Sequence, residues 1–294
     1  MIELWFAIIA FLWTGYFVLE GFDFGVGLLA PLVSRNAAEQ RAGLETIGPV
    51  WDGNEVWLIT AVGAMFAAFP AWYAGVFSAF YLPVTLILVG LIVRGVGLEW
   101  RGKVTNPVWC DLGIVVGSAL PAFLWGAVFA DLLHDSVPAA LLGGGFTLAV
   151  CILHGAVFLS LKTTGPVRRR ARTVAVAAGA VTIPVAVFAL SSLGTAPALA
   201  SMAALAAATA LIWRRREGWA FAATAGAIVL ATLALFMELR VRPLPGLTLA
   251  EAASGPYTLT VLSWIGLIAL PFVLVYQGWT YWVFRKRVRV GAVS

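Results

Sequence analysis

Apolar residues fill long, closely spaced runs along the chain, and most charged residues lie in the short stretches between them. A helix needs about 20 apolar residues to cross the hydrocarbon core of a bilayer, because each residue adds about 1.5 Å of rise. On that basis we predict nine transmembrane helices, with ends set to within several residues: Leu4–Leu29, Asn54–Phe69, Tyr73–Val93, Cys110–Ala130, Ala139–Leu161, Thr173–Leu193, Ala196–Trp213, Gly218–Met237 and Tyr257–Phe284. Gly194 and Thr195 alone separate the sixth and seventh, which predicts a tight helical hairpin. Gly21 and Gly25 in the first predict close contact with another helix.

Composition supports an all-α, polytopic membrane protein. Hydrophobic residues make up 62% of the chain and charged residues 11%, whereas soluble domains carry about a quarter charged residues. The first residues lack the basic region of a cleaved signal peptide, so we expect the first run to remain as a helix. Cys110 and Cys151 form neither a metal pattern nor a disulfide framework, and we expect no metal site. The net charge of +5 needs no nucleic-acid partner to explain it, because it follows from where the basic residues lie.

The basic residues predict the orientation of the chain in the membrane. All but two of the 19 Lys and Arg residues, Arg240 and Arg242, lie in or beside the odd-numbered loops or in the C-terminal tail. The positive-inside rule therefore places those loops and the C-terminus in the cytoplasm, and the N-terminus outside.

Acidic residues within the apolar runs are the main functional signal. Glu20 and Asp23 are three residues apart and share one face of the first helix. Acids at membrane depth are costly against lipid, so these two should face protein or a water-filled path. Asp52 and Glu55 repeat the spacing at the start of the second helix, and Arg94 ends the third. The predicted orientation places all five residues toward the cytoplasmic side.

Each of these residues also has a structural interpretation. Asp52 and Glu55 fit the start of a helix with a capping box. Arg94 can either extend to the membrane surface or act as the counter-ion of the acids. Asp111 begins the fourth helix at the same level, and we favour an interfacial role for it.

The acids leave three kinds of function open: a proton entry path, cation coordination in a transporter, and a static polar network. A chain that binds several haems needs several axial histidines or methionines. His134 lies in an outside loop and only His154 lies within a predicted helix. We therefore assign no catalytic residue, redox centre or cofactor site to this chain.

Two segments then indicate a family. WTGYFVLEGFDFG (residues 13–25) and PVWDGNEVWL (residues 49–58) closely resemble subunit II of the cytochrome bd-type quinol oxidases. The resemblance implies nine helices in two four-helix bundles plus a peripheral helix, which we divide as residues 1–138, 139–240 and 241–294. It also implies a bacterial plasma (inner) membrane protein paired with a subunit I, which carries the b-type and d-type haems and the quinol-oxidising loop. Such a complex reduces O2 to water with electrons from quinol and protons from the cytoplasm.

The resemblance also suggests roles for single residues. Asp23 and Asp52 match acids assigned to proton supply toward haem d, and Trp57 matches a tryptophan at the mouth of an oxygen-access route. Glu20, Glu55 and Arg94 are expected to support the same polar network, Arg94 as counter-ion.

Several alternatives stay open at the level of the whole protein. Some family members hold a structural quinone in this subunit and some complexes contain small accessory subunits, and the motifs decide neither point. A proton- or cation-coupled secondary transporter using Glu20, Asp23, Asp52 and Glu55 is the rival from another class. A pure assembly subunit is the structural rival.

Overall fold

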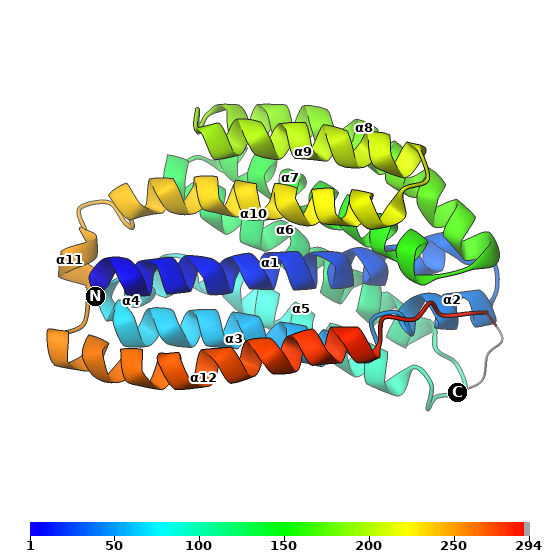
Figure 1. Ribbon diagram of the computed structural model, residues 1–294, viewed down its shortest axis with the longest axis horizontal. Helices are drawn as coiled ribbons and strands as arrows, with labels where there is room; N and C mark the ends of the chain where they lie inside the picture. The colour runs from blue at the N-terminus through cyan, green and yellow to red at the C-terminus, as the bar shows by residue number, and fades with distance from the viewer. Residues whose placement is uncertain (291–294) are drawn as a thin grey trace.

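The computed structural model describes residues 1–290, so the last four residues of the predicted peripheral unit lie outside it. Within the described part all regular elements are helices, with two isolated bridges and no β-strand (Figure 1). The helices in chain order are α1 (Ile2–Val33), α2 (Ala37–Leu44), α3 (Trp51–Ala68), α4 (Pro70–Ala79), α5 (Tyr81–Trp100), α6 (Val108–His134), α7 (Val137–Lys162), α8 (Gly165–Ser191), α9 (Ala196–Trp213), α10 (Glu217–Val241), α11 (Leu249–Ala252) and α12 (Pro256–Val283).

Eight helices among residues 1–290 are long and apolar enough to cross a membrane: α1, α5, α6, α7, α8, α9, α10 and α12. The prediction of a multi-pass, all-helical membrane protein is therefore confirmed. The second predicted span corresponds to α3, which has 18 residues and begins with the polar Asp52, Asn54 and Glu55. Those polar residues lower the mean hydropathy of α3, so α3 is not among the eight helices that are long and apolar enough to be spans.

The predicted third span, Tyr73–Val93, has the wrong boundaries. The chain breaks at Phe80 into α4 and α5, and the second of these helices runs on to Trp100. Pro83 explains the break, because its ring lacks an N–H and would clash with the carbonyl of Ala79 in a continuous helix. Hydropathy does not register this break, since both sides of it are apolar.

The hairpin between the sixth and seventh predicted spans is confirmed as the turn between α8 and α9. Gly194 has a φ of +59°, a left-handed conformation that glycine adopts without strain. Thr195 then caps α9 by accepting a hydrogen bond from the amide of Ala198.

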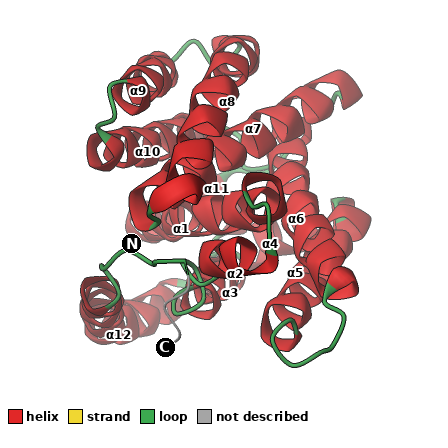
Figure 2. Cartoon of the chain, turned by 90° about the vertical axis from the view of Figure 1, so that its right-hand side faces the viewer, coloured by secondary structure: helices red, strands yellow, loops and turns green. Residues whose placement is uncertain are grey.

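Helix α1 lies at the centre of the molecule and contacts α3, α6, α7 and α10 (Figures 1 and 2). Its closest approach is to α7, where a Cβ added at Gly25 would lie 2.0 Å from the carbonyl oxygen of Cys151. A Cβ at Gly155, on the α7 side, would lie 2.5 Å from the Cα of Gly25. The predicted close helix contact is therefore confirmed at Gly25, whereas Gly21 makes only ordinary contacts.

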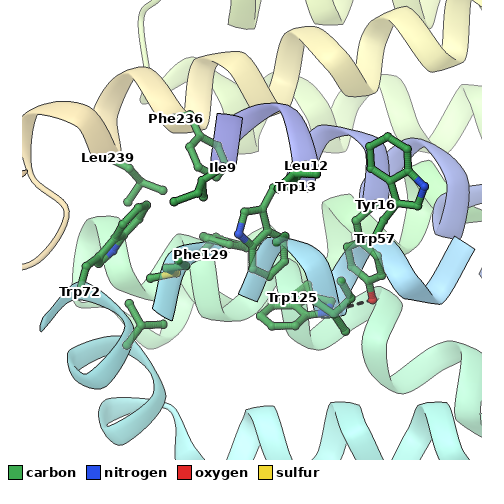
Figure 3. Close-up of a cluster of buried hydrophobic side chains, with 14 of the residues drawn as sticks. Ile9, Leu12, Trp13, Tyr16, Trp57, Trp72, Trp125, Phe129, Phe236 and Leu239 are labelled. Atoms are coloured by element: carbon green, nitrogen blue, oxygen red, sulfur yellow. Dashed lines mark hydrogen bonds between the residues drawn. The ribbon is translucent and has the colours of Figure 1, made fainter. Parts of the chain in front are cut away.

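Two hydrophobic clusters meet along α1. The first, shown in Figure 3, packs Trp13 edge-on against Trp125 and Phe129, and the indole of Trp125 donates a 3.1 Å hydrogen bond to the Tyr16 hydroxyl. The second centres on Phe22, which stacks on Phe158 of α7 with ring centroids 4.1 Å apart. Residues 20–23 lie where the two clusters join, so the backbone there is held firmly.

Ion pairs join the helix ends on the side that carries most basic residues. Arg170 of α8 pairs with Glu39 of α2, and Arg168 and Arg172 pair with Glu217 of α10. The Arg35 amide and the Arg170 guanidinium both donate to Glu39, and they hold the pKa of its carboxyl below the usual 4.5. These contacts join α8 to both α2 and α10.

Candidate functional site: a buried acid–arginine cluster

Glu20, Asp23, Glu55 and Arg94 come together in one place, which we call the acid–arginine cluster. Glu20 and Asp23 come from α1, Glu55 from α3 and Arg94 from α5. The side chains of Glu20, Asp23 and Arg94 are completely inaccessible to solvent, and that of Glu55 is 24% exposed. Three helices therefore enclose the ionisable groups, and Glu55 is the member that reaches the surface.

Arg94 lies at the centre of the cluster. Its Nη1 donates to Glu20 Oε2 at 2.5 Å and to Glu55 Oε1 at 3.4 Å, and its Nη2 lies 3.9 Å from Asp23 Oδ2. Its guanidinium carbon also lies 4.8 Å from the centre of the Phe24 ring, a cation–π distance. The alternative in which Arg94 extends to the membrane surface is wrong, because the residue is buried among the acids.

The cluster contains more acidic than basic groups, and some of its buried polar atoms have no hydrogen-bond partner among the described residues. Three carboxyl groups face one guanidinium, and carboxylates that share a buried site cannot all be ionised cheaply. Four buried polar atoms of the cluster have no hydrogen-bond partner among residues 1–290: Glu20 Oε1, Asp23 Oδ1, Arg94 Nε and Arg94 Nη2. Such groups cost free energy when unpartnered, so the arrangement suits a site that binds protons or water.

Asn54 is a site residue that the sequence analysis missed. Its Nδ2 donates a 2.6 Å hydrogen bond to Asp23 Oδ2. Its Oδ1 accepts from Gln277 Nε2 at 3.0 Å and from the Tyr281 hydroxyl at 2.9 Å. Asn54 lies inside the PVWDGNEVWL segment, and this position could have indicated a role. Its amide carries no charge, however, so the search for costly buried charges did not select it. Gln277 and Tyr281 lie more than 200 residues away in sequence and had no local signal.

Asp52 lies outside the cluster. It is exposed in the first turn of α3, one helical turn before Glu55. Val50 is the N-cap of α3 and no side chain caps that end, so the predicted capping box is wrong. Solvent exposure therefore decreases from Asp52, which is exposed, to Glu55, which is partly exposed, and then to Glu20 and Asp23, which are buried.

Asp111, which begins α6 near the same level, is not part of the cluster. Its carboxylate pairs with Arg101 at 2.5 Å, and both side chains are partly exposed. The favoured interfacial role for Asp111 is therefore consistent with its position. Of the five acids predicted near this level, Glu20, Asp23 and Glu55 come together, whereas Asp52 and Asp111 lie apart from them.

Trp57 and His154 both have structural contacts. The Trp57 ring lies over Gly15, where an added Cβ would come within 2.1 Å of it, and packs against Phe11. His154 is buried, with Nδ1 at 2.6 Å from the Thr224 hydroxyl and Nε2 at 3.2 Å from the carbonyl of Val18. Both ring nitrogens of His154 have partners, as expected for a packed histidine.

An apolar cavity of about 500 Å³ lies among α6, α7, α8, α9 and α10, beside α1. Phe17, Trp125, Phe129 and Phe146 are among its lining residues. The hydroxyls of Thr147, Ser201 and Thr232, which also line it, donate to backbone carbonyls. The lining is mostly apolar and these three hydroxyls give their protons to the backbone, so we derive no step through a quinone.

Fold and site together define a class: a helical, multi-pass membrane protein that encloses a cluster of ionisable groups inside its helices. Residues 1–284 match the family described as cytochrome bd terminal oxidase subunit II. The chain belongs to this family, which confirms the resemblance seen in the two motifs.

Relatives and a solved structure agree with the family assignment. Cytochrome bd ubiquinol oxidase subunit 2 of Bacillus subtilis (strain 168) is 37% identical over 326 residues, which cover 97% of this chain and 96% of the relative. Cytochrome bd-I ubiquinol oxidase subunit 2 of Escherichia coli (strain K12) is 30% identical over 357 residues, covering 97% and 94%. These relatives are oxidase subunits, so the prediction of a subunit of an oxidoreductase is confirmed.

The structure of bd oxidase from Geobacillus thermodenitrificans contains a chain with the same fold. The TM-score is 0.79 at 17% identity, and the match covers 97% of this chain and 99% of that one. At this level of identity the likeness shows the fold alone.

Proposed function

We propose that this chain is the non-haem subunit of a bd-type quinol oxidase and that its acid–arginine cluster supplies protons to the oxygen chemistry of a haem-bearing subunit I. The complex would reduce O2 to water with electrons from quinol, the b-type and d-type haems lying in the partner subunit. The observation that carries the proposal is the placement of three carboxyl groups around Arg94, of which Glu55 alone reaches the surface.

The proposed path starts at Asp52 and passes Glu55 to Asp23 and Glu20. Asp52 is exposed, Glu55 is partly exposed, and the α1 pair is fully buried, so burial increases along the path. Arg94 contacts or approaches every buried member, and it offsets their negative charge when they are ionised. Glu20 Oε1 and Asp23 Oδ1 accept no hydrogen bond among residues 1–290, so each carboxyl group has an oxygen that can take up a proton.

The orientation of the chain gives the path its direction. We propose nine spans, namely the eight long apolar helices and α3 as the second span in chain order, with an outside N-terminus and a cytoplasmic C-terminus, in the bacterial inner membrane. Ten residues of α1 follow Asp23, or about 15 Å of helix, so the cluster lies deeper than the end of the helix. Helix α3 begins only a turn before Glu55, and its start is therefore the short way in from the cytoplasm.

The division into residues 1–138, 139–240 and 241–294 is kept as a proposal for two four-helix bundles and a peripheral helix. Its support is the exposure of α12, in which Leu259 is the one buried residue. Trp57 is proposed to lie at the mouth of an oxygen route, because it matches a tryptophan at that place in the family.

The change Asp23→Asn tests the proton-supply role. It keeps the size of the side chain but removes the proton-carrying group, so quinol oxidase turnover of the assembled complex should fall by about 100-fold. The haem absorption spectrum of the same complex should stay normal. Asp111→Asn is the matched control, because Asp111 lies near the same level but pairs with Arg101 outside the cluster.

The outcomes separate the rivals. Full turnover in a spectrally normal Asp23→Asn complex would contradict the proton-supply role. A lower yield of complex with normal turnover per haem would favour a pure assembly subunit. Family membership gives the transporter alternative no support, and purification of the chain alone and colourless would be the result that revives it.

A further inference from the structure

We propose that Gln277 and Tyr281 of α12 are positioning residues for Asp23, acting through the amide of Asn54. This inference rests on the proposed proton-supply function and assigns residues to it that the motifs do not contain. It starts from the chain of hydrogen bonds that runs from α12 through α3 to α1.

Two donors converge on one atom. The Gln277 amide and the Tyr281 hydroxyl donate to Asn54 Oδ1 at 3.0 and 2.9 Å, and this oxygen has two lone pairs to accept them. With Oδ1 held toward α12, the Nδ2 of Asn54 must point the other way, where it donates to Asp23 at 2.6 Å. As donors, the two α12 residues therefore favour the orientation in which the N–H end of the amide meets Asp23.

That choice matters for the chemistry of Asp23. An amide N–H donates to a carboxylate and favours its charged form, whereas an amide oxygen would repel it. Asp23 also faces Arg94 of α5, Glu20 of α1 and Glu55 of α3, so the amide acts on a carboxyl group already held between opposing charges. A free Asn54 could rotate its amide and present either end.

The second half of α12 buries little besides the residues that face Asn54. Between Pro271 and Val283 every residue is exposed except Gln277, Thr280 and Tyr281. Gln277 and Tyr281 are four residues apart and share one face of the helix, directed at Asn54. The inward face of this half of α12 is thus built around the hydrogen bonds to Asn54.

Both ends of α12 are anchored to the body of the protein. At the outer end, the Trp5 indole donates to the Leu259 carbonyl at 3.2 Å and to the Ser263 hydroxyl at 3.0 Å. At the other end, Arg287 Nε donates to the Leu161 carbonyl at 2.9 Å and the Val288 amide donates to the Lys162 carbonyl at 2.8 Å. These contacts to α1 and α7 set the position of Gln277 and Tyr281 along α3.

The test uses Tyr281→Phe and Gln277→Leu in the assembled oxidase. Each change removes one donor to Asn54 and keeps most of the side-chain volume, and each should lower turnover roughly threefold to tenfold with unchanged haem spectra. Tyr276→Phe is the matched control, because Tyr276 lies on the same helix, is 63% exposed and should leave turnover unchanged.

A second readout separates positioning from a general structural effect. The carboxyl C=O stretching band that disappears from the redox-induced infrared difference spectrum in Asp23→Asn belongs to Asp23. This band should shift in Tyr281→Phe and Gln277→Leu but not in Tyr276→Phe. In an Asn54→Leu background, Tyr281→Phe and Gln277→Leu should cause no further loss, since both act through Asn54.

Three results would contradict the inference, and they can be told apart. If Asp23→Asn lowers turnover but the α12 variants behave like Tyr276→Phe, with an unmoved Asp23 band, the positioning role is wrong and proton supply stands. If Asp23→Asn has full turnover, the proposed function itself is wrong. Losses in the α12 variants that add to that of Asn54→Leu would also contradict action through Asn54.

Discussion

Arg94 is the residue on which the electrostatics of the cluster depend. Among the described residues it is the one cation paired with the acids of the cluster, and it is itself completely buried. Removing one partner of a buried ion pair leaves an uncompensated charge, which is far more costly than losing a surface pair. The stability of this region should therefore be sensitive to Arg94 and insensitive to most other basic residues.

The change Arg94→Gln should destabilise the folded chain by about 3 kcal/mol or more, because Glu20 and Asp23 lose their buried counter-charge. The thermal midpoint of the purified complex measures this loss. Lys103→Gln is the control, since its pair with Glu99 is more than half exposed on both sides and should contribute about 0–1 kcal/mol. Equal midpoints for Arg94→Gln and Lys103→Gln would show that the buried pair does not hold the site together.

At the scale of the helices, the contact between α1 and α7 fixes the backbone that carries Glu20 and Asp23. Gly25 and Gly155 face each other, and the nearest obstacle to a side chain at Gly25 is a backbone oxygen, which cannot turn aside as a side chain would. Glycine at positions 25 and 155 therefore allows the backbones of α1 and α7 to touch.

The change Gly25→Ala should cost about 1–3 kcal/mol through overpacking, seen as a lower thermal midpoint of the complex. Gly145→Ala in α7 offers the comparison, since an added Cβ there meets nothing within 4 Å and alanine is the better helix former. If both changes leave the midpoint unaltered, the close approach of α1 and α7 is not as tight as described.

The helices and the buried acids were predictable from sequence for a simple reason. The length of an apolar run and the cost of placing an acid against lipid can both be read from a short stretch of sequence. The first predicted α9 with its observed ends, and the second singled out Glu20 and Asp23. The break at Phe80 was missed because both flanking segments are apolar. Asn54, Gln277 and Tyr281 were missed because they are neutral and meet only through the packing of α12 on α3.

At the scale of the whole molecule, this chain has ionisable chemistry at its centre and large apolar surfaces outside. Exposed residues such as Trp109, Phe272 and Trp279 suit lipid or another apolar protein surface. The acid–arginine cluster opens toward the start of α3, on the side where the basic loops gather. The proposed role follows from this asymmetry: the chain carries protons from one side of the membrane to a reaction in a neighbouring subunit.

Proton uptake by the oxidase complex reconstituted in vesicles tests this account most directly. After a pulse of O2 to the quinol-reduced complex, uptake would be followed on the side of the membrane that carries the C-terminal tail. In Asp23→Asn we expect uptake and water formation to slow together, by about 100-fold, while electron transfer from quinol to the haems keeps its rate. Uptake at the wild-type rate in Asp23→Asn would contradict the claim that this cluster supplies the protons.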